Sequence, residues 1–133
     1  PHPSLYTRPP CFFFGYGPMS AATITEADWQ AQFVQLARIL GWRHLHVRRS
    51  LGRGKKWVTA TNQDGWPDLH LWHETQQRVI YVELKSETGR LRPQQTEVLG
   101  SLTRAGQEVY VLRPSDLEVA KRILSGERIE VSA

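Results

Sequence analysis

Two neighbouring stretches of the chain alternate between apolar and polar residues, and this alternation constrains the fold more than any other feature. The first covers residues 68–73 and the second residues 78–85, with a polar turn at 74–77 between them. Because successive side chains of a strand point to opposite faces of a sheet, each stretch is typical of a β-strand, and the short turn predicts a hairpin. In the second strand, Glu83 and Lys85 therefore point to the same face.

Three other stretches repeat apolar residues at the spacing of amphipathic helices: 26–40, 93–105 and 115–124. The ends of these stretches carry residues that are typical of helix starts and helix ends. Thr25 and Ser115 begin capping boxes, and Pro93 suits a first helical turn. The glycines that follow the last turns are Gly41, Gly106 and Gly126.

Two further strands complete the expected order of elements. Residues 43–48 alternate, and we expect Leu45 and Val47 on the buried face with the histidines on the other. Residues 107–113 form an apolar strand, whereas 49–65 has the composition of a long loop. The order α-β-β-β-α-β-α predicts an α/β fold with a mixed sheet flanked by helices.

The chain has 133 residues, of which 40% are hydrophobic, and this favours one ordinary globular domain. Its one cysteine, Cys11, excludes an internal disulfide framework and fits a reducing, cytoplasmic setting. No apolar run reaches the ~18–20 residues that cross a bilayer. Residues 1–18 hold five of the eight prolines, so we expect residues 1–19 to be a leader or expression-derived segment and 20–133 to be the domain.

Basic residues are concentrated in one part of the chain. The net charge is +4, and residues 43–56 contain no acidic residue and six basic ones: Arg43, Arg48, Arg49, Arg53, Lys55 and Lys56. A concentrated patch of this kind is expected of a protein that binds a polyanion, because neutralised phosphates release counterions. Trp57 follows the patch and can stack on a base or sugar. A solvated basic loop is the alternative interpretation.

The hairpin brings together residues that suit metal-dependent phosphodiester hydrolysis. Asp68 and Glu83 are far apart in sequence, but the start of one strand folds back beside the end of the next. Two carboxylates and the carbonyl of Leu84 offer the oxygen ligands of Mg²⁺ or Mn²⁺. Lys85 can orient or deprotonate a water and stabilise developing negative charge. The alternative is a strand-starting aspartate and a surface ion pair between Glu83 and Lys85.

The histidines need a separate interpretation. His44 and His46 alternate on one predicted strand, and His70 and His73 lie on another. We expect exposed sheet residues rather than a metal cluster. His70 shares a face with Asp68 and so borders the proposed site.

Three motifs together resemble a known family. They are Gly65-Trp66-Pro67-Asp68-Leu69, Tyr81-Val82-Glu83-Leu84-Lys85-Ser86 and Gly89-Arg90-Leu91-Arg92-Pro93-Gln94-Gln95. In this combination they resemble the virus-type replication-repair nuclease (VRR-NUC) domain, a branch of the PD-(D/E)xK nucleases, over roughly residues 25–123. The resemblance implies an αβββαβ restriction-endonuclease-like core and a Mg²⁺- or Mn²⁺-dependent DNA endonuclease.

The resemblance also implies roles for individual residues. Asp68, Glu83 and Lys85 match the catalytic motif, and a glutamine of the following helix is matched by Gln95, which lies on the apolar stripe of that helix. An acid of the first helix, a further metal ligand, is best matched by Glu26. We expect Glu26 to extend the inward-facing stripe, although a carboxylate at a helix start is also favoured by the helix dipole. Arg90 and Arg92 of the third motif join the predicted DNA contacts.

Small stand-alone members of this family are often phage-encoded and are associated with homodimers that cut branched DNA such as four-way junctions. The resemblance therefore implies a homodimer acting in a bacterial or phage-infected cytoplasm. Two alternatives remain open: a module of the same fold that binds nucleic acid without cutting it, and a sequence-specific restriction-type endonuclease.

Overall fold

The computed structural model describes residues 24–47, 49–51, 57–59 and 62–129. Its elements follow the chain in the order α1 (Glu26–Ile39), β1 (Arg43–His46), β2 (Arg49–Leu51), β3 (Trp57–Thr59), β4 (Leu69–His73), β5 (Arg78–Leu84), α2 (Pro93–Arg104), β6 (Glu108–Leu112), η2 (Pro114–Asp116) and α3 (Leu117–Leu124). Within these ranges no helix is both long and apolar enough to span a membrane. The expectations for residues 1–19 fall outside the described part of the chain.

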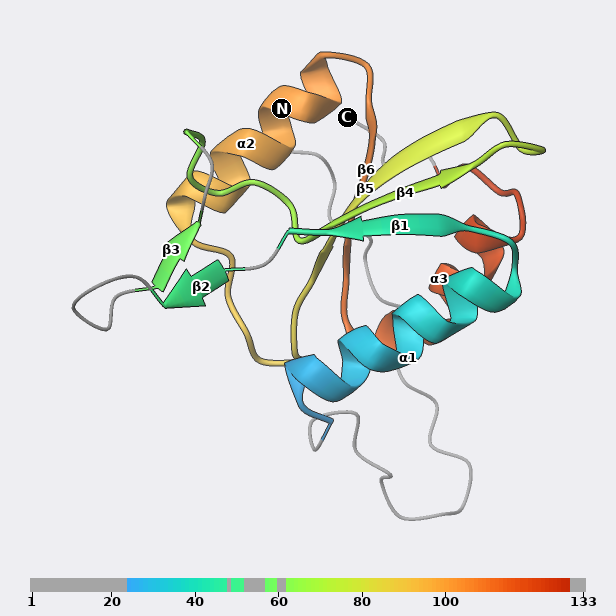
Figure 1. Ribbon diagram of the computed structural model, residues 1–133, viewed down its shortest axis with the longest axis horizontal. Helices are drawn as coiled ribbons and strands as arrows, with labels where there is room; N and C mark the ends of the chain where they lie inside the picture. The colour runs from blue at the N-terminus through green and yellow to red at the C-terminus, as the bar shows by residue number, and fades with distance from the viewer. Residues whose placement is uncertain (1–23, 48, 52–56, 60–61, 130–133) are drawn as a thin grey trace.

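Four strands form a mixed sheet in the order β1-β4-β5-β6. The β1–β4 and β4–β5 pairs are antiparallel, whereas β5 and β6 are parallel. Parallel neighbours need a crossover connection, and α2 provides it. Figure 1 shows α1 and α3 on one side of the sheet and α2 on the other. The predicted α/β fold, a mixed sheet flanked by helices, is confirmed.

The main core lies between the sheet and helices α1 and α3. The strand residues that face it have no exposed surface: Leu69, Leu71, Ile80, Val82 and Leu84. From α1, Trp29, Phe33 and Ala37 are fully buried against them, as the helical spacing predicts. Each large side chain buried in this way stabilises the fold by about 1.5–3 kcal/mol. The indole N–H of Trp29 donates to the backbone oxygen of Leu112 at 3.1 Å, which fixes α1 against the end of β6.

Helix α2 covers part of the opposite face of the sheet. The strand register puts Glu83 of β5 and Val111 of β6 side by side on that face. α2 packs beside β6 and buries Gln95, Val98 and Leu99. A polar residue near the end of β5 therefore lies beneath a helix, which is the arrangement that the site requires.

The start of β5 is held to the C-terminal part of the chain by one buried arginine. Arg78 is only 6% exposed. Its guanidinium pairs with Glu108 of β6 and donates to the backbone oxygens of Ile123 at 2.8 Å and Glu127 at 3.1 Å. Because a buried cation needs partners for its charge and its donors, these contacts make Arg78 a structural clamp between β5, β6 and the end of α3.

The two faces of β1 are the reverse of those predicted. Leu45 is 54% exposed and lies opposite His70, whereas His44 is half-buried opposite the core residue Leu71. The preceding Trp42 is buried and its indole N–H donates to the backbone oxygen of Leu124 at 2.8 Å. Since side chains alternate along a strand, an inward Trp42 turns residue 44 inward and Leu45 outward.

Residues 49–65, predicted to be a loop, contain a short hairpin. β2 and β3 pair antiparallel, with Arg49 opposite Thr59 and Leu51 opposite Trp57. Three-residue strands are too short to leave a recognisable alternation in the sequence.

The capping box predicted at Ser115 is also wrong. A 3₁₀ turn begins at Pro114 with Arg113 as its N-cap, and the side chain of Asp116, the third residue of the turn, accepts the backbone N–H of Arg113 at 2.8 Å. The box predicted at Thr25 does form its first bond, because Thr25 Oγ1 accepts the N–H of Asp28 at 3.1 Å.

Candidate active site

The segment before Asp68 depends on one glycine. Gly65 has a φ of +86°, and a Cβ atom at this position would overlap the backbone oxygen of Gln94 in α2. Only glycine combines this left-handed backbone with so close an approach. Pro67 is buried two residues later. The close contact brings the loop that carries Asp68 against the first turn of α2.

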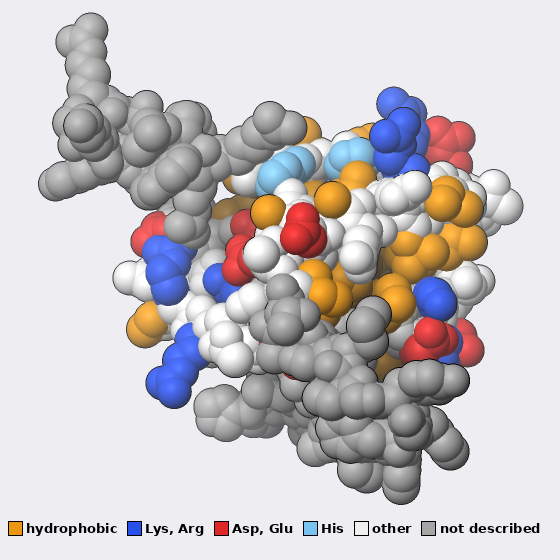
Figure 2. Space-filling model, turned by 90° about the horizontal axis from the view of Figure 1, so that it is seen from below, with side chains coloured by type: hydrophobic (Ala, Val, Ile, Leu, Met, Phe, Trp, Pro, Cys, Tyr) orange, Lys and Arg blue, Asp and Glu red, His pale blue; other side chains and the backbone are white. Residues whose placement is uncertain are grey.

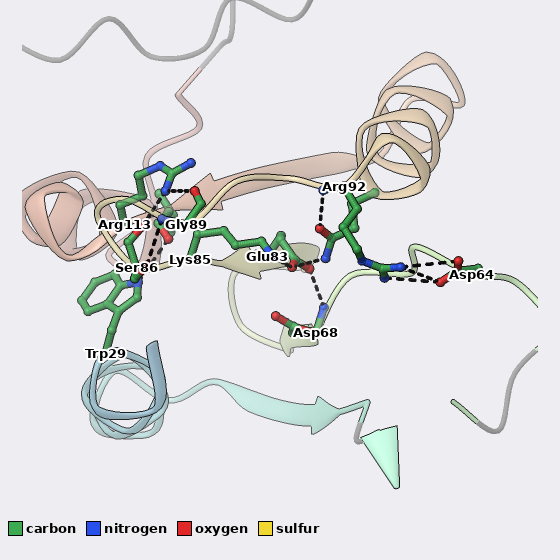
Figure 3. Close-up of polar contacts among 11 residues, drawn as sticks. Trp29, Asp64, Asp68, Glu83, Lys85, Ser86, Gly89, Arg92 and Arg113 are labelled. Carbon is green, nitrogen blue, oxygen red and sulfur yellow. Dashed lines mark hydrogen bonds and ion pairs between the residues drawn. The ribbon is translucent and has the colours of Figure 1, made fainter. Parts of the chain in front are cut away.

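Asp68 and Glu83 lie opposite each other just beyond the β4–β5 ladder (Figure 3). The last ladder pair joins Leu69 to Val82, so the next positions are Asp68 and Glu83, and both side chains take the α2 side of the sheet. The backbone N–H of Asp68 donates to Oε2 of Glu83 at 3.1 Å. The predicted hairpin therefore brings the two carboxylates together.

Lys85 and Gln95 both contact the other oxygen of Glu83. The Nζ of Lys85 lies 3.5 Å from Oε1, and the lysine side chain extends towards Glu83 in Figure 3. Nε2 of Gln95 donates to the same oxygen at 2.7 Å. Oε1 of Gln95 in turn accepts the backbone N–H of Arg92 at 2.9 Å. Gln95 therefore ties Glu83 to the first turn of α2, and these two bonds orient its amide group.

The environment of Glu83 disfavours its charged form. Glu83 is 1% exposed. Burial raises the pKa of Glu83 from 4.5 to about 7; the nearby carboxylate of Asp68 adds to the rise, and the ammonium of Lys85 opposes it. A carboxylate that is buried beside a second carboxylate is stabilised in its ionised form by an added cation.

The oxygen atoms of this site fit a hard divalent cation. The N–H of Lys85 donates to Leu112 on the β6 side. In a trans peptide the carbonyl points opposite to the following N–H, so the Leu84 carbonyl points towards the β4 side, where Asp68 follows the ladder. Two carboxylates and one carbonyl are ligands that Mg²⁺ and Mn²⁺ accept. Over the described ranges, no group of three His, Cys, Asp or Glu residues suits a metal ion.

Glu26 is not on the inward-facing stripe, contrary to the prediction. It is exposed in the first turn of α1. One turn later, Nε2 of Gln30 lies 2.8 Å from Nε2 of His46 at the end of β1. The buried residues of α1 are Trp29, Phe33 and Ala37, so its buried stripe begins after Glu26. In the described part of the chain, Glu26 makes no hydrogen bond or ion pair with Asp68, Glu83 or Lys85.

The predicted DNA-binding residues are only partly placed. Arg48, Arg53, Lys55 and Lys56 lie outside the described residues, and for Arg49 and Trp57 only the backbone is described, in β2 and β3. Arg90 is exposed in the loop between β5 and α2. The guanidinium of Arg92 pairs with Asp64 at 3.3 Å, and both side chains reach solvent. Figure 2, which views the molecule from below, shows basic, acidic and hydrophobic side chains interspersed on that face.

The histidines are spread over both faces of the sheet. His44 and His46 face α1, and His73 bonds the backbone oxygen of Leu40 at 3.0 Å. His70 lies on the face of Asp68, as predicted, and accepts a hydrogen bond from the indole N–H of Trp66. Burial lowers the pKa of His70, which keeps its ring neutral near pH 7.

Two arrangements around the site were not predicted from the sequence. Trp66, His70 and Tyr81 contact one another through their rings. Arg113 donates to the backbone oxygens of Ser86 and Gly89 and so holds the loop after Lys85 (Figure 3). The aromatic cluster could have been predicted in part, because the strand alternation places residues 66, 68 and 70 on one side. Nothing local marks Arg113, because its partners lie more than 20 residues away.

This arrangement defines a class of protein. A strand that starts after Pro-Asp, a neighbouring strand that ends in Glu-x-Lys, and a helix that covers both are the elements of the PD-(D/E)xK nuclease fold. A family model described as VRR-NUC domain matches residues 19–116, and the chain belongs to the VRR-NUC family. Membership implies a nuclease whose substrate is DNA. Comparison with curated proteins and with solved structures gave no match.

Proposed function

We propose that this protein is a Mg²⁺- or Mn²⁺-dependent endonuclease that hydrolyses phosphodiester bonds in branched DNA, such as a four-way junction or a flap. The observation that carries the proposal is the convergence of Asp68 and Glu83 beside Lys85. Glu83 is buried, and the carboxylate of Asp68 disfavours its ionised form. A structural ion pair does not need a second carboxylate opposite the first. A metal-binding nuclease site does.

The residues that would hold the metal are Asp68, Glu83 and the carbonyl of Leu84. Glu26 is the candidate for a ligand from α1, acting directly or through a water. When bound, a divalent cation binds phosphate oxygens, neutralises their charge and lowers the pKa of a water. The oxygen ligands and the raised pKa of Glu83 are the reasons that the site suits a divalent cation.

Lys85 and Gln95 position the reacting groups and stabilise charge during the reaction. Lys85, as an ammonium, orients the attacking water and stabilises negative charge that develops at phosphorus; a Lys85 that has lost its proton would instead accept the proton of that water. Gln95 is a positioning residue: it donates to Glu83 Oε1 and holds that carboxylate in one orientation through the first turn of α2. A correctly oriented carboxylate matters because small misplacements at a reacting centre are costly to the rate.

DNA binding in this proposal uses the basic residues of the third motif and of residues 48–56. Arg90, Arg92 and the basic side chains of residues 48–56 contact phosphates, and Trp57 stacks on a base or sugar. The protein acts as a homodimer, because two copies bring two sites to one branch point. Selectivity for branched DNA and dimerisation are supported by the resemblance to small stand-alone family members.

The test is cleavage of a labelled four-way junction in Mg²⁺. Wild type is expected to cut it, and Lys85→Ala to lower kcat by about 100-fold or more. Lys121→Ala is the matched control, since Lys121 is an exposed lysine of α3 that pairs with Glu118. No cleavage by wild type, or undiminished cleavage by Lys85→Ala, contradicts the proposal.

The same assay separates the two alternatives. A protein that binds the junction and leaves it intact in both metals is a non-cleaving module. Discrete fragments from linear plasmid DNA, with little action on junctions, indicate a restriction-type enzyme. Sedimentation of the protein with and without junction DNA reports whether it forms the dimer.

A further inference from the structure

Three aromatic side chains form a cluster on the face of the sheet that carries the site. The ring centroids of His70 and Tyr81 lie 4.9 Å apart, and those of Trp66 and His70 lie 5.5 Å apart. Trp66 also meets Tyr81 edge to face at 6.1 Å. All three residues are half-buried, so the cluster reaches solvent while its rings restrain one another.

The cluster fixes which nitrogen of His70 carries the proton. An indole N–H is only a donor, and Trp66 Nε1 donates to Nε2 of His70. Nε2 must therefore be unprotonated, and the ring proton lies on Nδ1. Within the described ranges no other hydrogen bond involves His70. Its Nδ1–H is left as a donor.

The strand register places this donor one step from the proposed cleavage site. Asp68 and Glu83 are opposite each other, and the next pair on the same face is His70 with Tyr81. Two residues along a strand span about 6.6 Å. This step is comparable with the spacing of consecutive phosphates in one nucleic-acid strand.

We propose that His70 donates a hydrogen bond from Nδ1–H to the phosphate next to the one that is cleaved, with Trp66 and Tyr81 as positioning residues for its ring. The proposal rests on the proposed function for the identity of the neighbouring site. It adds a contact that sets the register of the DNA strand over Asp68 and Glu83. The rings of Trp66 and Tyr81 need no contact with DNA in this role.

A purely structural cluster would have a different signature. If the Trp66–His70 bond served only packing, replacing His70 would lower thermal stability and would weaken all substrates alike. A phosphate contact instead depends on one position of the DNA. His70→Asn separates the two roles, because the asparagine Nδ2 lies near the place of the imidazole Nδ1 and keeps a donor, whereas His70→Ala removes it.

The experiment scans a junction strand with single methylphosphonates, which replace a charged phosphate oxygen by a neutral methyl group. Binding is measured by fluorescence anisotropy in EDTA for wild type, His70→Ala, His70→Asn and Lys85→Ala. Trp72→Phe is the control, since Trp72 lies one register step beyond His70 on the same face. Thermal melting of each variant establishes that it is folded.

Wild type is expected to lose about five- to tenfold in affinity when the contacted phosphate is neutralised. His70→Ala should lose sensitivity at that position alone, whereas His70→Asn and Trp72→Phe retain it. Lys85→Ala should lose sensitivity at the adjacent phosphate. Two results overturn the proposal. One is a His70→Ala variant that loses affinity at the same methylphosphonate positions as wild type. The other is a position of lost sensitivity in His70→Ala that is not adjacent to the position affected in Lys85→Ala.

The test of the His70 contact can fail or succeed independently of the test for nuclease activity. Junction binding without cleavage in Mg²⁺ or Mn²⁺ contradicts the nuclease proposal, while the methylphosphonate profile still decides the role of His70. A wild-type protein without affinity for DNA contradicts both.

Discussion

Replacing Asp68 by asparagine should make the metal-free protein more stable while it removes the proposed metal site. The reason is the raised pKa of Glu83, to which the Asp68 carboxylate contributes. The asparagine side chain has nearly the same shape as that of aspartate and carries no charge. The variant therefore removes the like-charge repulsion and leaves the backbone N–H that donates to Glu83 Oε2 in place.

The sign of the pH dependence follows from the direction of the shift. The folded-state pKa of Glu83 is about 7, above its ordinary value of 4.5. The free energy of unfolding is therefore highest below the unfolded-state pKa, falls as pH rises towards 7, and is constant above that. The whole loss corresponds to roughly 3 kcal/mol.

Asp68 causes the smaller part of this loss, since desolvation is the larger cause. Asp68 is half-exposed. Because water screens the Asp68 carboxylate, we expect its share to be on the order of 1 kcal/mol. For a domain of this size, that free energy corresponds to a rise in Tm of roughly 3–6 °C.

The assay is thermal melting at pH 8 and at pH 4.5, in EDTA and in a series of Mn²⁺ concentrations. Asp68→Asn should melt above wild type at pH 8 in EDTA and equal to it at pH 4.5. Added Mn²⁺ should raise the Tm of wild type, because a ligand of the folded state stabilises it, and should raise that of the variant less. Asp64→Asn, in the same loop but exposed, is the control and should gain nothing in EDTA.

Two results refute the reasoning. One is an Asp68→Asn variant that is no more stable than wild type at pH 8 in EDTA. The other is an equal Tm increase in Mn²⁺ for both proteins, which would place the metal elsewhere.

Three further predictions use other contacts. Gln95→Leu removes the donor to the buried glutamate and leaves the backbone N–H at the start of α2 unpaired, so stability should fall by about 2 kcal/mol in denaturant unfolding, with a lower kcat. Arg78→Met leaves Glu108 without its buried partner and should cost about 3 kcal/mol, with kcat unchanged at a temperature where the variant is folded. Lys55→Ala with Lys56→Ala should reduce the salt slope of DNA binding by about two, and an unchanged slope would remove both lysines from the interface.

The alternation of residues 68–85 was enough to predict the centre of the molecule. A period of two, broken by a polar turn, specifies a hairpin and the face of every side chain on it. This local rule placed Glu83 and Lys85 on one face and brought Asp68 back towards them. The helical spacing likewise predicted an amphipathic helix over residues 26–40, and α1 buries Trp29, Phe33 and Ala37, because a helix with one apolar stripe must turn that stripe to the core.

Other features depended on partners that are distant in the sequence. Leu45 faces outward because Trp42 is inserted beside α3, and an alternating strand fits either face until such an anchor chooses one. Glu26 is exposed at the start of α1, whose buried residues begin only at Trp29. The hairpin of β2 and β3 was missed because its strands are too short to show a period.

The sequence by itself determined the residue types of the site and the strands that present them, since both follow from alternation and short spacing. Only the tertiary structure decided how those groups interact. The bond from Gln95 to Glu83 requires α2 to lie over the end of β5, and that position depends on the close approach of Gly65 to Gln94. The raised pKa of Glu83 likewise needs burial, which arises when the helix covers the sheet.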